Sequence, residues 1–151
     1  MSKPRIFLDY ASATPVDPAV ATAMEPYVSD YFYNPSSLYA GARAVRQAID
    51  TARTTIATSI GAHADEIVFT SGGTEADNLA LLGVVAASAK SAKHIIVSQI
   101  EHQAILNTAR ALEKMGVKVS YAPVNKQGLV DLKVLDSLIT IDTILISVML
   151  A

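Results

Sequence analysis

The sequence has no cysteine and no tryptophan among its 151 residues. Without cysteine, disulfides, thiolate metal sites and a thiol nucleophile are excluded within these residues. Charged residues make up only 17% of the chain, the net charge is −2, and no basic run occurs, so we expect no nucleic-acid partner. The longest uncharged apolar run, residues 79–89, is too short to cross a bilayer, and no signal-peptide core precedes Phe7. These absences predict a cytoplasmic protein with no membrane association.

Apolar residues, in contrast, make up 51% of the chain, which suits a sheet that is covered on both faces. Hydrophobic periodicity together with glycine, proline and capping signals predicts strands that alternate with helices. The expected strands are 5–8, 67–70, 93–98, 117–122 and 143–149, and the expected helices are 18–29, 38–60, 74–88, 101–115 and 131–139. This order predicts an α/β fold, with right-handed βαβ units and a mainly parallel sheet that carries helices on both faces.

One stretch carries most of the chemical information: the apolar segment 67–70, then Ser71-Gly72-Gly73, then a helix that Thr74 opens. A helix start offers unpaired backbone amides and a positive dipole end, for which phosphate is a natural ligand. Gly72 and Gly73 let the backbone turn sharply and approach an anion closely. The alternative is that Thr74 is simply an N-cap in a tight turn, and this segment alone does not decide between the two. The pattern is neither a dinucleotide-binding fingerprint nor a P-loop.

A second candidate is His102, which follows Glu101 directly after the expected strand 93–98. Ligands of open α/β sheets bind beyond the carboxyl ends of the strands, so His102 is expected close to Thr74. Its imidazole could stack on a flat ligand or relay a proton, or could simply make a local hydrogen bond at a helix start. Glu75 is expected to complement the helix dipole and to point away from a bound phosphate. No histidine pair has metal-ligand spacing, so we predict no metal.

Five segments, in order, carry a family resemblance: residues 8–16, 34–37, 69–80, 101–102 and 142–149. Together they resemble the N-terminal part of a cysteine desulfurase of the NifS/IscS type, within the class V aminotransferase group. Members are pyridoxal phosphate (PLP) enzymes of fold type I. Their large domain has a mainly parallel seven-stranded sheet, their small domain uses both chain ends, and they form homodimers. The resemblance implies that residues 1–151 are an incomplete large domain, truncated before its sheet is complete, with 1–20 packing near the small domain.

The resemblance also implies roles for individual residues. Gly73 and Thr74 would bind the PLP phosphate, and His102 would stack on the pyridine ring and take part in proton transfer. Three further residues would lie on the substrate side of the site: Ala13, Thr14 and Asn34. The family reaction removes sulfur from L-cysteine, which leaves alanine and an enzyme persulfide. A sulfur-acceptor protein then takes the persulfide sulfur for iron–sulfur cluster or thionucleoside assembly.

Several parts of the family pattern are absent from this sequence. The family's Schiff-base lysine follows a Ser-x-His motif that does not occur here, and its ring-pairing aspartate, persulfide cysteine and substrate-binding arginine lie beyond the matching region. The apolar strand 143–149 is followed only by Leu150-Ala151, which predicts a truncated product or one half of a split protein. We therefore expect the chain to be inactive alone, and to need a complementary C-terminal half or a dimer partner. The alternatives are another class V enzyme, such as an aminotransferase or selenocysteine lyase, or a non-catalytic fragment.

Overall fold

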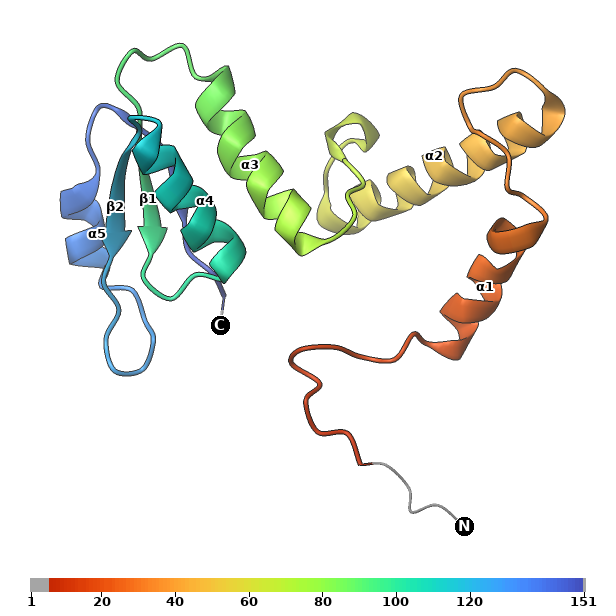
Figure 1. Cartoon of the computed structure of the whole chain (residues 1–151), viewed down its shortest axis with the longest axis horizontal. Coiled ribbons are helices and arrows are strands. Elements are labelled where there is room, and N and C mark those ends of the chain that lie inside the picture. The colour runs from red at the N-terminus through yellow and green to blue at the C-terminus, as the bar shows by residue number, and fades with distance from the viewer. Residues whose placement is uncertain (1–5, 151) are drawn as a thin grey trace. The chain divides into compact units, whose positions relative to one another are not determined.

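The computed structural model describes residues 6–150, and the chain divides into two compact units, Met1–Val68 and Phe69–Ala151. The first unit contains helix α1 (Pro18–Ser29), helix α2 (Ala40–Ile60) and the short 3-10 helix η1 (Ala64–Glu66) (Figure 1). Helix α1 has the predicted bounds, because the Asp17 carboxylate accepts a hydrogen bond from the Ala19 amide at 2.8 Å and Pro18 supplies the first helical position.

Helix α2 begins two residues later than the sequence predicted and ends as expected at Gly61, which has a left-handed φ of 69°. Its buried residues are Ala42, Val45 and Ala57. The ring of Tyr33 packs so closely on Gly41 that a Cβ there would lie 2.5 Å from two ring carbons. Tyr33 therefore anchors the loop between α1 and α2 on helix α2.

The second unit is the α/β part of the chain. Its elements are helix α3 (Gly73–Ala87), strand β1 (His94–Ser98), helix α4 (Gln103–Lys114), strand β2 (Lys118–Ala122), helix α5 (Leu132–Leu138) and strand β3 (Thr143–Ser147). Within the described residues the strands form one parallel sheet in the order β2-β1-β3 (Figure 1). The predicted parallel α/β fold is thus confirmed for this unit.

The sheet order explains why strand β1 is the centre of the core. Strand β2 pairs with one edge of β1, and β3 pairs with the other edge. Because the two crossovers run in opposite directions and both are expected to be right-handed, α4 and α5 are expected on opposite faces of the sheet. All five residues of β1 are buried. The main hydrophobic cluster joins β1 to α3 and α4 through Leu81, Val85, Ile95, Val97, Ile105, Leu106, Ala109 and Leu112.

Two expected strands do not form within residues 6–150. Residues 67–70 form no ladder with any strand in the described part of the chain, and Val68 and Phe69 are 65% and 48% exposed. Their apolar, β-branched composition favours a strand, but a strand also needs a hydrogen-bonded neighbour. The expected strand 5–8 lies partly outside the described residues, and its described part, 6–8, is irregular. No helix between residues 6 and 150 is long and apolar enough to cross a membrane.

Candidate functional site

The N-terminus of helix α3 forms the first part of the candidate site. The helix begins at Gly73, with Gly72 as N-cap, so Thr74 is the second helical residue and the N-cap reading of Thr74 is wrong. The first helical hydrogen bond runs from the Ala76 amide to the Gly72 carbonyl at 3.1 Å. The amides of Gly73 and Thr74 therefore point beyond the helix end, where an anion would meet them. Open space surrounds both glycines, because a Cβ built at Gly72 or Gly73 meets nothing within 4 Å.

The acidic side chain of this helix turn points back to its own loop. Glu75 Oε2 accepts two hydrogen bonds of 2.6 Å from Ser71, one from the hydroxyl and one from the backbone amide. These bonds, the one from the hydroxyl first, lower the pKa of Glu75 below its ordinary value. The carboxylate is therefore ionised and held by Ser71, as expected for a residue that does not contact the anion itself.

His102 forms the second part of the site, at the carboxyl end of strand β1. It is the N-cap of α4, and its Nδ1 accepts a hydrogen bond of 3.1 Å from the Ala104 amide. The local hydrogen bond that the sequence offered as an alternative is therefore present. It does not exclude a functional role, because the residue is exposed and the neutral ring then carries its proton on Nε2, on the far side of the imidazole.

A single pocket of about 470 Å³ brings the two parts together. Thr74 and Asn78 of α3 line one side of it, and His102 at the start of α4 lines the other, together with Thr108. The remaining lining residues are Leu82, Gln103, Ala104, Asn107 and Ala111. The sequence predicted that Thr74 and His102 would lie close together, and the structure confirms it. The pocket thus places the first turn of α3 near an exposed imidazole.

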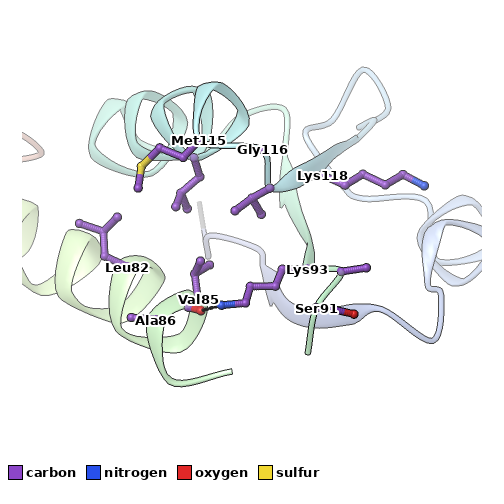
Figure 2. Close-up of a pocket in the computed structure, with 11 residues that line it drawn as sticks. Leu82, Val85, Ala86, Ser91, Lys93, Met115, Gly116 and Lys118 are labelled. Atoms are coloured by element: carbon purple, nitrogen blue, oxygen red, sulfur yellow. Dashed lines mark hydrogen bonds between the residues drawn. The ribbon is translucent and has the colours of Figure 1, made fainter. Parts of the chain in front are cut away.

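A larger pocket of about 650 Å³ lies at the opposite ends of strands β1 and β2 (Figure 2). Its wall is largely apolar, with Leu82, Val85 and Met115 among the residues drawn. Lys93 Nζ donates to the Val85 carbonyl at 2.6 Å, which satisfies the helix end, and the Lys118 amine points away from the pocket. Because the Lys93 amine is already bonded to Val85 and the pocket lies at the amino ends of the strands, this pocket is not the candidate site.

The expected substrate-side residues belong to the other unit. Ala13 and Thr14 lie in an exposed loop before α1, and the exposed Asn34 accepts a hydrogen bond of 2.9 Å from the Ser36 amide. Their proximity to Thr74 and His102 stays a prediction, as does the role of residues 1–20. Across the described residues, no three His, Asp or Glu side chains gather as a metal site would require.

Asn78 and Thr108 are among the pocket residues that sequence reasoning missed. Asn78 stands four residues after Thr74, a spacing that places both on one helix face and would have been a usable signal. Thr108 lies in the middle of α4 and had no comparable signal, because its role depends on how α3 packs on α4.

Comparison with known proteins agrees with this fold. The sequence profile of the family described as aminotransferase class-V matches residues 6–151. The chain belongs to the class V aminotransferase family, whose members generally use PLP.

The relatives that it resembles are cysteine desulfurases. The chain is 47% identical over 147 residues to the cysteine desulfurase IscS of Dictyoglomus turgidum, a match that covers 97% of this chain and 37% of the relative. Among solved structures, a NifS-like protein matches with a TM-score of 0.90 at 34% identity, over 95% of this chain and 39% of the other. The structure described as SspA in complex with cysteine matches with a TM-score of 0.85 at 40% identity, over 91% and 40%. The chain thus spans well under half the length of these proteins.

Proposed function

We propose that this chain forms the phosphate-binding and ring-covering part of a PLP-dependent cysteine desulfurase. The observation that carries the proposal is the single pocket lined by both Thr74 and His102. In the proposed complex the amides of Gly73 and Thr74, with the Thr74 hydroxyl, bind the cofactor phosphate. The imidazole of His102 covers the pyridine ring. The similarity to cysteine desulfurases, one of them described in complex with cysteine, supports L-cysteine as the substrate.

The residues of the pocket fit such a ligand in charge and in shape. The positive end of the α3 dipole and two free amides complement a phosphate dianion, and the carboxylate of Glu75 is turned to Ser71. The opposite wall offers the exposed, flat imidazole of His102, whose Nε2–H can donate a hydrogen bond to the ligand. When bound, PLP supplies the electron sink for bond cleavage at the amino-acid substrate.

Sulfur transfer in the proposed reaction needs a thiol from outside these residues, because the 151-residue sequence has no cysteine. Sulfur would pass from L-cysteine to that thiol as a persulfide, leave alanine behind, and move on to a sulfur-acceptor protein. We propose that a complementary C-terminal half supplies the thiol and the cofactor-binding lysine, either as a separate chain or as part of a homodimer partner. We propose the cytoplasm as the location of this assembly. Ala13, Thr14 and Asn34 are proposed to contact the substrate in that assembly.

Titration of the chain with inorganic phosphate and with PLP, followed by amide NMR shifts, tests the proposal. We expect both ligands to shift the amides of Gly73 and Thr74, and PLP to shift His102 as well. Thr74→Val keeps the side-chain size and removes the hydroxyl, so it should weaken phosphate binding by about tenfold, as for one hydrogen bond to a charged group. Thr55→Val, on exposed α2, is the matched control and should change nothing. Unshifted α3 amides at saturating phosphate would overturn the assignment.

A further inference from the structure

A chain of hydrogen bonds connects the two halves of the pocket through Asn78 and Thr108. Asn78 Nδ2 donates to the Thr74 carbonyl at 2.7 Å, and Asn78 Oδ1 accepts from Thr108 Oγ1 at 2.6 Å across the two helices. Thr108 Oγ1 also lies 2.8 Å from the Ala104 carbonyl, so its single hydroxyl hydrogen is shared between the two acceptors. The connection therefore reaches from the first turn of α3 to the first turn of α4.

The last link is the bond that orients the imidazole. Ala104 makes two of these bonds. Its carbonyl accepts from Thr108 Oγ1, and its amide donates to His102 Nδ1 at 3.1 Å. Thr74 at one end of the network and His102 at the other line the same pocket. Hydrogen bonds and the backbone of Ala104 therefore connect the Thr74 carbonyl to the imidazole of His102 without a break.

The hydrogen bond between Asn78 and Thr108 is shielded from water. Thr108 is only 6% exposed and Asn78 is partly buried, so water competes poorly for their polar atoms. Apolar packing between α3 and α4, through residues such as Leu81 and Leu106, holds the helices together but is not directional. A hydrogen bond with defined donor and acceptor atoms fixes the register of one helix on the other.

We propose that Asn78 and Thr108 are positioning residues, which set the spacing between the phosphate-binding turn of α3 and the ring-covering His102. This inference rests on the proposed function, because the ligand that spans the two ends is the phosphate and ring of PLP. Asn78 and Thr108 need not touch that ligand. Their effect is on a ligand that contacts both ends at once, and a ligand that contacts only the α3 end is indifferent to them.

The distinguishing experiment compares inorganic phosphate with PLP in Thr108→Val, an isosteric variant that lacks the hydroxyl. We expect phosphate affinity within about twofold of wild type and PLP affinity reduced about five- to tenfold, the effect of one buried hydrogen bond. Thr108→Ser should restore PLP affinity. Asn78→Ala combined with Thr108→Val should weaken PLP binding no more than the stronger single variant, because both remove the same bond. An equal loss for both ligands, or for neither, would overturn the proposal.

A second measurement separates this proposal from the identity of the ligand. Amide hydrogen exchange at Ala104, in the ligand-free chain, reports the bond that orients His102. We expect faster exchange in Thr108→Val, wild-type exchange in Thr108→Ser, and no change in Thr55→Val. Thr55 makes the same kind of bond to the carbonyl four residues earlier, at 2.9 Å, but on an exposed face of α2. Unchanged exchange at Ala104 would refute the positioning role, whereas failure of wild type to bind PLP would refute only the proposed function.

Discussion

The buried histidine of strand β1 makes the stability of the chain depend on pH. His94 is 1% exposed, and its ring nitrogens lie 2.8 Å from Thr143 Oγ1 and 2.9 Å from Ser120 Oγ, so it joins all the strands of the described sheet. Burial lowers the pKa of His94 below its ordinary value of 6.5, the charge of Lys118 lowers it further, and Asp142 opposes them. The unfolded chain therefore binds a proton more readily than the folded chain.

The sign and size of the effect follow from linkage. Because the folded pKa is depressed, the stability that neutral His94 contributes is fully present above the unfolded pKa of about 6.5 and is lost as the pH falls below it. One proton is involved, so the slope from His94 is at most about 1.4 kcal/mol per pH unit. The carboxylates titrate mainly below about pH 5, so the window from pH 7.5 to 5.5 excludes them, and comparison with a His94 variant separates His94 from the other two histidines.

Urea unfolding at pH 7.5, 6.5 and 5.5, followed by circular dichroism, measures this slope. His94→Gln keeps a donor and an acceptor but does not titrate, so it should cost about 1–3 kcal/mol at pH 7.5 and flatten the pH dependence. Lys118→Gln removes a charge that disfavours the imidazolium, so it should make the slope shallower while His94 remains. Equal slopes for wild type and His94→Gln would refute the reasoning.

Two further predictions use the same unfolding assay. Glu101 is 6% exposed, and its Oε1 accepts hydrogen bonds from Ser98 Oγ at 3.0 Å and from the Met149 amide at 2.7 Å. Glu101→Ala should therefore lower the free energy of unfolding by about 2–4 kcal/mol, and Glu101→Gln, which keeps an acceptor oxygen, by clearly less. Equal losses of stability in the two variants would contradict this. Gly83 lies inside α3 with open space around it, so Gly83→Ala should stabilise the chain by about 0.5–1 kcal/mol. Gly116 has a φ of 89°, which an alanine adopts only with strain, so Gly116→Ala should destabilise the chain by about 1–2 kcal/mol. Effects of the same sign would refute the argument that backbone conformation decides the outcome.

Local signals in the sequence predicted the helices well. Asp17 and Pro18 define the start of α1, Gly61 ends α2, and Asp131 caps α5 through bonds to the Lys133 and Val134 amides. Each of these signals acts within one turn of backbone, so the neighbouring residues are sufficient to read it. The pairing of Thr74 with His102 was also predictable, because it follows from a general property of parallel sheets.

The errors concern features that depend on residues distant in the chain. Residues 67–70 have the composition of a strand, but strand formation is decided by a neighbouring backbone and not by composition. The Asn78–Thr108 bond joins residues 30 positions apart, and its existence depends on the packing of α3 on α4. The sequence also left open whether Thr74 caps the helix, and in the structure the glycine before the helix takes that position and leaves the threonine hydroxyl available.

Strand β1 has a further consequence as the inner strand of the described sheet. It is hydrogen-bonded on both edges, and His102 follows it after only a short turn. Releasing β1 would separate both neighbours at once, so its amides are expected to open only when the whole unit unfolds. The imidazole of His102 thus lies next to the strand that we expect to move least. We expect any movement that a ligand requires to occur in the first turn of α3 and the loop before it.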